Sequence, residues 1–217
     1  MMNRSARPSG LIKPNLMADH NPMTKQPFAS TMKKYAAAPQ RHPETTLEAP
    51  TEFCFDYNFD ENGVLYYLGT YGKRRNWQNP HSVGQVQAFA SSIGVGCPVE
   101  AFVGRTVQNC RTEDEPYSFF GVDLGQERRL VPTFYTLRNR NSTTHVIRNW
   151  YFEGSVTGAS WTILDARIYQ SESHERNQAL ETEFRDLQKR GGAMTFKIDT
   201  DIYRQLGMDG YRFFRIV

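Results

Sequence analysis

The feature that most constrains the fold is a series of short runs rich in aromatic and β-branched residues, separated by turns that contain Gly or Asn. Such runs lie at 63–70, 118–125, 132–140, 149–156, 160–169, 193–199 and 211–217. Residues of these types favour strands, and closely spaced short strands with Gly and Asn turns are typical of a β-sandwich. The sequence therefore predicts an all-β sandwich over residues 51–217.

One segment of this region has a different period. Between residues 174 and 192 the apolar side chains recur at helical spacing, at Ala179, Leu180, Phe184 and Leu187. Two basic residues precede Gly191, as is typical of a helix C-terminus. We therefore expect one amphipathic helix at 175–190, inserted between two strands.

The segment 136–164 predicts the central hairpin of the sandwich. It contains two Trp on successive strand-like runs, with the turn sequence SVTGAS between them. The alternation predicts Trp150 and Phe152 on the inward face of one strand, and Trp161 and Ile163 on the inward face of the next. Such a segment supplies a large apolar surface to a core and contains no nucleophile with a neighbouring base.

The first 50 residues form a second, different part of the chain. They contain seven of the eleven Pro, and their apolar residues follow neither strand nor helix periodicity. They carry seven Lys and Arg against three acids, whereas residues 51–217 carry nineteen against twenty. This composition predicts an extended basic arm at 1–50 that orders only on an acidic partner surface.

The contact residues expected in the arm are six of its seven basic residues and one Tyr: Arg4, Arg7, Lys13, Lys25, Lys33, Lys34 and Tyr35. An alternative interpretation is a mitochondrial presequence, because the first three of these precede any acid. Pro8 and Pro14 argue against the single amphipathic helix that a presequence requires. The first 20 residues lack the apolar core of a secretory signal, and no apolar run is long enough to span a membrane.

Catalysis, a cofactor and a metal site are not expected. The five His lie apart, and the chain has neither G-x-S-x-G nor H-E-x-x-H. The acids Asp56, Asp60 and Glu61 do not have the spacing of a calcium loop, and a turn capped by Asp and Asn side chains accounts for them better. The three Cys have no metal-like spacing, so we expect free thiols in a reducing compartment.

The best candidate for a binding loop is GKRRNWQNPH, residues 72–81. It combines cations with an aromatic residue and an amide, a composition common to sugar, phosphate and protein-binding sites. The candidate residues are Lys73, Arg74, Arg75, Trp77, Asn79 and His81, with Arg140 from a second loop. The alternative is that Trp77 closes the end of the core while the three cations are solvated.

Six ordered motifs in this region resemble a known family. They are FDENGVLYYLGT, WQNPH, SFFGVDLG, PTFYTLRNR, IRNWYFEGSVTGASWTIL and YRFFRI. Together they resemble the discoidin-like, galactose-binding-like β-sandwich, also called the coagulation-factor type C fold. The resemblance is closest to the intracellular version found in HECT-type ubiquitin ligases and BTB-domain proteins, and it covers about 59–170 and 211–216. It implies a jelly-roll sandwich whose end loops bind ligands or peptides, and it implies that Arg138 and Arg148 pair internally, for instance with Asp123.

Three departures from the family pattern matter. Phe119 stands where the family usually has Trp, and Thr157–Gly158 replaces an Asp-Gly turn. Related domains also continue past the YRFFRI motif into a final strand, so we expect an open strand edge that a partner or the arm covers.

Three functions follow as hypotheses. The first is a non-catalytic structural subunit of a large intracellular assembly, with protein partners and no nucleic acid or membrane. The partner that best fits the basic arm is an acidic polymer. The specific hypothesis is therefore a cytoskeletal, axonemal or inner-microtubule protein that contacts tubulin in the cytoplasm or cilium. The second is a substrate- or peptide-recognition adaptor in ubiquitin ligation, and the third is a carbohydrate-binding module.

Overall fold

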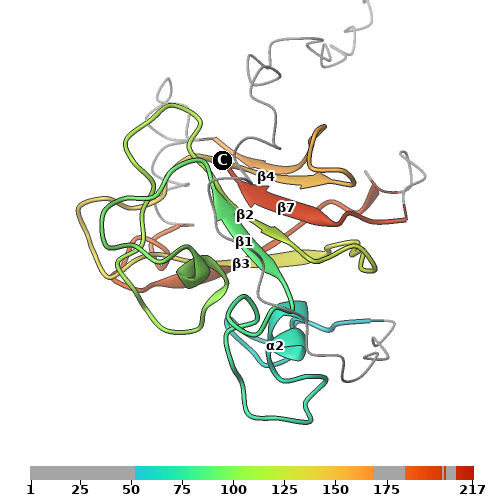
Figure 1. Cartoon of the computed structure of the whole chain (residues 1–217). Coiled ribbons are helices and arrows are strands. Elements are labelled where there is room, and N and C mark those ends of the chain that lie inside the picture. Colours follow the sequence, from blue (N-terminus) through green and yellow to red (C-terminus); the bar gives the residue numbers. More distant parts are fainter. Residues whose placement is uncertain (1–51, 169–183, 202, 204–208) are drawn as a thin grey trace, which may run out of the picture.

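The fold consists of two antiparallel sheets (Figure 1), seen in a computed structural model that describes residues 52–168, 184–201, 203 and 209–217. The larger sheet has the strand order β1-β2-β7-β4-β5, and the smaller one pairs β3 with β6. In chain order the strands are β1 (Gln87–Ala90), β2 (Phe120–Asp123), β3 (Phe134–Arg138), β4 (Trp150–Ser155), β5 (Thr162–Arg167), β6 (Ala193–Lys197) and β7 (Phe213–Ile216). The all-β class is therefore confirmed, while the arm at 1–50 lies outside the described residues.

The two sheets pack face to face through aromatic side chains. Tyr135 of β3 stacks on Phe152 of β4 with ring centroids 4.4 Å apart, and Trp150 meets Phe196 of β6 at 5.1 Å. Phe152 also stacks on Phe214 of β7. Large rings from both sheets thus fill the interior, which is the arrangement expected for a sandwich core.

The other face of the larger sheet is also covered, by a smaller aromatic cluster. Phe89, Phe119 and Phe213 are buried there, and Trp161 packs against them. Gly121 of β2 permits this packing, because a Cβ at that position would lie 2.4 Å from the ring of Phe89. Aromatic side chains are therefore buried on both faces of the five-stranded sheet.

In the described part of the chain, short helical segments adjoin the sheets, and the first of them corrects a prediction. The run 63–70 forms α2 (Val64–Gly69), not a strand, and η2 (Val99–Val103) is a 3-10 turn. Leu68 is buried in the core, and Val64 and Leu65 pack against the same cluster. In so short an apolar run the strand and helix patterns cannot be distinguished, and contact with the core selects the helix.

The hairpin that contains Trp150 follows the prediction on one strand only. Trp150 and Phe152 are buried as expected, but on β5 it is Leu164 that enters the core, while Ile163 is 47% exposed. The cause is a bulge: Phe152 pairs with Asp165 and Glu153 with Ile163, so Leu164 has no opposite residue. One extra residue in a strand changes which side chains face inward.

Six of the seven predicted strand runs contain a strand, and β1 was not predicted. Most of the helix predicted at 175–190 lies outside the described residues, and residues 184–190 form turns instead of an α-helix. The apolar spacing was nevertheless informative, because Phe184 and Leu187 are buried against Trp150 and Phe196. The turn residue Gly158 has a φ of 80°, which only a Gly adopts without strain.

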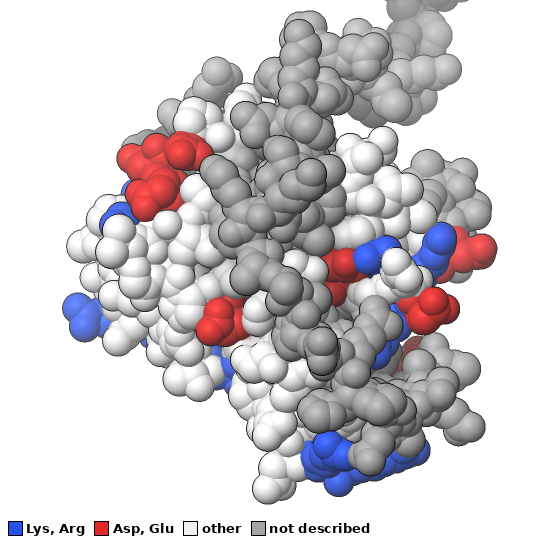
Figure 2. Space-filling view, in the orientation of Figure 1, with Lys and Arg blue, Asp and Glu red and all other residues white. Residues whose placement is uncertain are grey.

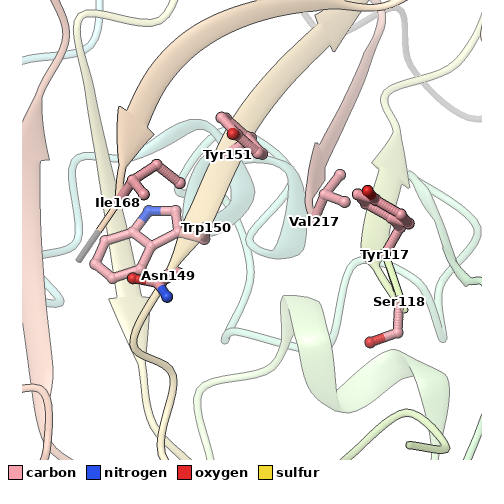
Figure 3. A pocket seen from close by; sticks show the side chains of 7 residues that line it. All are labelled: Tyr117, Ser118, Asn149, Trp150, Tyr151, Ile168 and Val217. Carbon is pink, nitrogen blue, oxygen red and sulfur yellow. The ribbon is translucent and has the colours of Figure 1, made fainter. Parts of the chain in front are cut away.

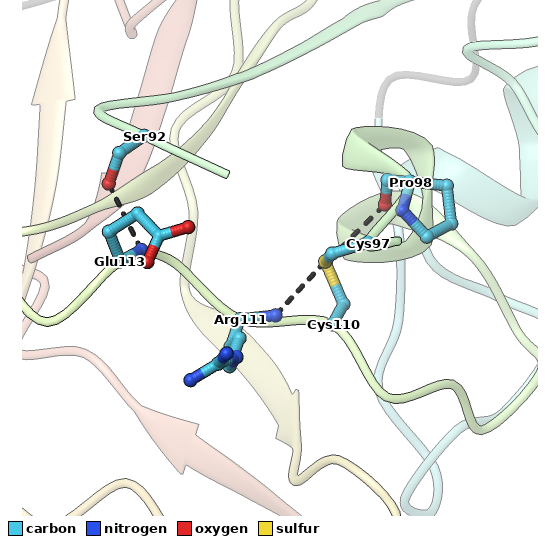
Figure 4. Close-up of a disulfide and its surroundings, with 6 residues drawn as sticks. All are labelled: Ser92, Cys97, Pro98, Cys110, Arg111 and Glu113. Atoms are coloured by element: carbon cyan, nitrogen blue, oxygen red, sulfur yellow. Dashed lines mark hydrogen bonds between the residues drawn. A yellow bond between two sulfur atoms is a disulfide. The ribbon is translucent and has the colours of Figure 1, made fainter. Parts of the chain in front are cut away.

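The expectation of three free thiols is wrong for two of them. Cys97 and Cys110 form a disulfide, with Cα atoms 4.8 Å apart (Figure 4). Cys54 is free and exposed. The amide of Arg111 donates a hydrogen bond of 3.0 Å to the sulfur of Cys97. The bridge ties the segment after β1 to the segment before β2, a pairing that a separation of 13 residues does not reveal in the sequence.

Candidate functional site: the basic loop after α2

The loop that follows α2 is folded back on the end of the helix. The amide of Gln78 donates to the carbonyl of Gly69 at 3.0 Å, which brings the two ends of the loop together. Thr70, only 2% exposed, organises the interior: its hydroxyl donates to the carbonyl of Tyr66 and accepts the amide of Lys73. Closed ends and an internal anchor are properties of compact functional surface loops.

Three consecutive residues of this loop have left-handed backbone conformations. The φ angles are 50° at Tyr71, 73° at Gly72 and 65° at Lys73. For residues other than Gly this conformation costs free energy, and it persists only where the surroundings impose it. Here the amides of Arg74 and Arg75 both donate to the carbonyl of Thr70, which fixes the turn. The loop is therefore preorganised at a cost in strain.

The turn directs three cations outward. Lys73, Arg74 and Arg75 are all exposed. Figure 2 shows Lys and Arg atoms gathered at the lower edge of the view, in the region of the loop after α2. Arg75 stacks on the ring of Tyr71 at 4.6 Å, and the ammonium group of Lys73 lies 3.4 Å from the amide oxygen of Asn62. The structure thus brings together the three cations that the sequence singled out.

Trp77 closes the base of the loop. It is half-buried, and its indole packs so closely on Gly69 that a Cβ there would lie 2.8 Å from Nε1. This contact matches the alternative in which Trp77 covers the end of the core. A binding role for Trp77 remains a prediction.

Asn79 and His81 hold the backbone that follows the loop. The amide group of Asn79 donates to the carbonyl of Glu100 at 2.8 Å, and its oxygen accepts the amide of His81 at 2.9 Å. The Nδ1 atom of His81 accepts the amide of Ala88 at the start of the larger sheet, at 3.0 Å. Asn79 and His81 therefore stabilise the local fold through these hydrogen bonds. Their role in binding remains a prediction.

His81 makes the stability of this end of the fold depend on pH. Burial lowers the pKa of His81 below its usual value near 6.5, while Glu100 opposes the shift. Below about pH 6.5 the unfolded chain therefore binds more protons than the folded chain, and stability falls with falling pH. We expect the free energy of unfolding, measured with guanidinium chloride, to fall between pH 7.5 and 5.5.

The matched variants for this prediction are His81→Gln and His145→Gln. The first should flatten the pH dependence, because Gln can accept the amide of Ala88 without titrating. His145 lies in an exposed loop, so its variant should keep the dependence of the wild type. An unchanged slope in His81→Gln would assign the dependence to other groups.

Arg140 does not join the basic loop. Its carbonyl accepts the amide of Gly191 at 3.1 Å, beside the end of the β3–β6 sheet. Asp123, given as an example of an internal partner for Arg138 and Arg148, binds Arg212 instead, through two hydrogen bonds of 2.6 Å. Arg212 belongs to the YRFFRI motif, and its partner lies 89 residues away, so the sequence contained no local sign of the pair.

The acids considered for a metal stabilise a turn. Asp60 accepts the amides of Asp56 and Asn62 at 2.8 and 3.0 Å. Among the described residues no group of three or more His, Cys, Asp or Glu is placed to hold an ion.

The seven arm residues named as contacts lie outside the described part of the chain. No helix in the described part is long and apolar enough to cross a membrane.

A shallow pocket of about 280 Å³ lies where β4 begins and the chain ends (Figure 3). Its lining combines aromatic, polar and aliphatic side chains: Tyr117, Ser118, Asn149, Trp150, Tyr151, Ile168 and Val217. Tyr117 is 55% exposed and has a positive φ of 58°. None of these residues was singled out from the sequence as a binding residue.

Comparison with known proteins defines the class to which this chain is similar. The E3 ubiquitin-protein ligase Ufd4 of Drosophila melanogaster is 37% identical over 124 residues, which is 54% of this chain and 4% of the ligase. The E3 ubiquitin-protein ligase hecd-1 of Caenorhabditis elegans is 32% identical over 165 residues, 73% of this chain and 5% of the ligase. A BTB/POZ domain-containing protein of Arabidopsis thaliana is 32% identical over 120 residues, 52% of this chain and 14% of that protein.

The resemblance to ubiquitin ligases and a BTB protein, inferred from the motifs, is therefore confirmed. The chain spans a small part of each relative, so their whole-protein activities do not transfer to it. The similarity supports a module that binds another molecule. No family model matches the chain.

Two solved structures from Clostridium perfringens share part of this architecture. One is a family 32 carbohydrate-binding module in complex with galactose, 13% identical, covering 61% of this chain and 80% of that chain with a TM-score of 0.39. The other is a family 32 module in complex with GalNAc-β-1,3-galactose, 12% identical, covering 61% and 83% with a TM-score of 0.41.

Proposed function

We propose that this chain is a non-catalytic protein-interaction module that docks on a partner through the basic loop after α2. The observation that carries the proposal is the strained turn at Tyr71, Gly72 and Lys73, which is held by buried Thr70 and presents three exposed cations. Strain of this kind concentrates at functional sites, and preorganised cations lower the ordering cost of binding. The similarity to segments of two ubiquitin ligases favours a recognition adaptor in ubiquitin ligation within this proposal.

The test is a triple variant in the loop, Lys73→Asn, Arg74→Gln and Arg75→Gln, in the full chain. Asn tolerates the left-handed conformation at position 73, so the turn survives while the charges are lost. We expect proteins cross-linked to the tagged chain in cells to be recovered at least about tenfold less, because removing rim charges slows association.

The matched control removes three exposed cations elsewhere: Arg129→Gln, Arg185→Gln and Arg190→Gln. It should leave recovery unchanged, since it alters net charge to the same extent without touching the loop. Equal recovery from the two triple variants, quantified by mass spectrometry, would refute the proposal. Partners that include ligase subunits would support the adaptor role specifically.

A second candidate function rests on the charge of the arm. Residues 1–50 carry an excess of four positive charges, which favours an acidic polymer such as a microtubule, and hence tubulin, as the partner in a structural assembly. The direct test is co-sedimentation of the full chain with microtubules, against a variant with Gln at Arg4, Arg7, Lys13, Lys25, Lys33 and Lys34. If the hypothesis is right, the wild-type chain sediments with microtubules, and either the Gln substitutions or added salt abolishes this co-sedimentation.

The location of the protein belongs to the same proposal. Ubiquitin-ligase adaptors and microtubule proteins act in the reducing cytoplasm, where cysteines are kept as thiols. The Cys97–Cys110 disulfide, by contrast, is of a kind that persists in oxidising compartments. A cytoplasmic chain is therefore expected to hold this pair reduced.

A further inference from the structure

Strand β3 has an unpaired edge in the part of the chain that the structure describes. It pairs with β6 on one side only, since these two strands make up the smaller sheet. An open strand edge presents amides and carbonyls that can bind another extended chain.

The positions of the unpaired groups follow from the hydrogen bonds at the two ends of β3. The amide of Ile198 donates to the carbonyl of Thr133, and the amide of Asn139 donates to the carbonyl of Gly192. In an antiparallel pair such bonds recur at every second residue. The backbone groups of Phe134, Thr136 and Arg138 therefore point away from β6, toward the open edge.

The side chains of the same three residues lie on the outer face of the smaller sheet. Tyr135 and Leu137 pack in the core clusters, so the alternating positions face outward. Phe134 is 39% exposed and stacks on Phe55, itself 42% exposed, with centroids 5.1 Å apart. An exposed aromatic pair thus adjoins one end of the open edge.

Two guanidinium groups adjoin the other end. Arg138 lies 3.9 Å from the centroid of the Phe59 ring, and Arg105 lies 5.6 Å from the same ring. The guanidinium of Arg105 donates to the carbonyls of Phe59 and Asp60, at 2.8 and 3.0 Å, which holds it in place. Phe59 has a left-handed φ of 64°, so this arrangement also stores backbone strain.

Neither guanidinium pairs with a carboxylate among the described residues. Ion pairs among the described residues include those of Arg167 with Asp165, Lys189 with Asp186, Arg212 with Asp123 and Arg215 with Glu153, and none of these involves Arg138 or Arg105. Arg138 is half-buried, and both burial and the charge of Arg105 lower its pKa. Two neighbouring half-buried cations without an anion form a site that favours a carboxylate.

We propose that the open edge of β3 binds an extended acidic peptide segment of a partner protein as an added antiparallel strand. The backbone of the segment pairs with Phe134, Thr136 and Arg138, a carboxylate of the segment reaches Arg138 and Arg105, and an apolar side chain covers Phe134 and Phe55. Main-chain bonds supply affinity in this mode, and alternate side chains supply specificity.

The register of the added strand defines a sequence pattern. Residues of the segment opposite Arg138, Thr136 and Phe134 occupy positions p, p+2 and p+4, all on the outer face. Position p is Asp or Glu, and position p+4 is aromatic or aliphatic. Position p+2 faces the hydroxyl pair of Thr136 and Thr195, whose oxygens are 2.7 Å apart, and is suited to Ser or Thr.

A separate acidic segment fits better than this chain's own arm or a second copy. Residues 1–50 carry an excess of positive charge, which the two guanidinium groups repel. A second copy paired through β3 would bring two more guanidinium groups and no carboxylate. This surface differs from the basic loop of the proposed function, so each can fail without the other.

The first experiment titrates the full chain with a fluorescent ten-residue peptide of alternating Thr and Val that carries Glu at p and Phe at p+4. Two matched peptides have a single N-methyl group, at p+2 or at p+3. Of these two amides only the one at p+2 faces β3, so methylation there should weaken binding at least about tenfold, and methylation at p+3 should not. A peptide with Lys in place of Glu should also bind at least about tenfold more weakly.

Variants of the protein test the charged end of the site. Arg138→Gln and Arg105→Gln should each weaken binding of the Glu peptide about tenfold and reduce its dependence on salt, whereas Arg129→Gln should change neither. Thermal melting of each variant checks that the fold is retained. If the Glu and Lys peptides bind equally, or if neither binds, the proposal is wrong.

Amide hydrogen exchange followed by NMR tests the edge in the wild-type chain itself, independently of any variant. In the free protein the amides of Phe134, Thr136 and Arg138 should exchange fast, and those of Tyr135 and Leu137 slowly. The Glu peptide should slow the first three. Protection of these amides in the free full-length chain would show that the chain covers its own edge and would overturn the proposal.

Discussion

Replacing Arg215 with Met is expected to lower the free energy of unfolding by about 3–5 kcal/mol, because it leaves a buried carboxylate without its partner. Arg215 and Glu153 are opposite residues on β7 and β4, and their side chains are 6% and 7% exposed. The Nε atom of Arg215 donates to Glu153 at 2.5 Å. The guanidinium also stacks on Trp161 at 4.0 Å and on Phe119 at 5.0 Å. Urea unfolding at neutral pH measures the loss.

The double variant Arg215→Met with Glu153→Leu should recover most of the lost stability. Replacing both members of a buried ion pair by apolar side chains is often close to neutral, whereas removing one member is not. Lys189→Met serves as the control, since Lys189 and Asp186 form an exposed pair at 65% and 68% exposure, and it should cause no measurable change. A single variant Arg215→Met that unfolds like the wild type would show that water reaches Glu153.

Replacing Trp150 with Ala is expected to lower the free energy of unfolding by about 3–5 kcal/mol, through the cavity it creates. Trp150 is 1% exposed and contacts Phe184 and Phe196 with ring centroids 5.4 and 5.1 Å away. Its indole N–H donates to the hydroxyl of Tyr135 at 2.8 Å, and that hydroxyl donates to Asp165 at 2.6 Å. Guanidinium chloride unfolding followed by circular dichroism measures the effect.

Two further variants separate the packing of Trp150 from its hydrogen bond. Trp150→Phe keeps a ring in the core and loses the N–H donor, so it should cost about 1–2 kcal/mol less than the Ala variant. Ile163→Ala, on the exposed side of the neighbouring strand, should stay within about 0.5 kcal/mol of the wild type. If Trp150→Ala and Ile163→Ala lose similar stability, Trp150 does not support the core.

The candidate site shows what a sequence reveals about a surface. The three cations at 73–75 were identified because charge and exposure go together in a polar run, and the structure places them on one turn. The pair Arg105 and Arg138 was not identified, because 33 residues separate them and only the fold brings both to the ring of Phe59. Thr70 was missed for a different reason: its partners Tyr66 and Lys73 are only four and three residues away, but the residue type does not distinguish a buried hydroxyl from an exposed one.

The sequence by itself determined the all-β class and the location of strands β2 to β7, since period-two patterns and turn residues act over a few neighbouring positions. Only the tertiary structure decided the helix α2, the inward side of β5, the Cys97–Cys110 bridge and the partner of Asp123. Each of these depends on a contact or a register shift between segments distant in the chain. Local patterns do not encode such contacts, because the free energy that selects them comes from burial in the assembled core.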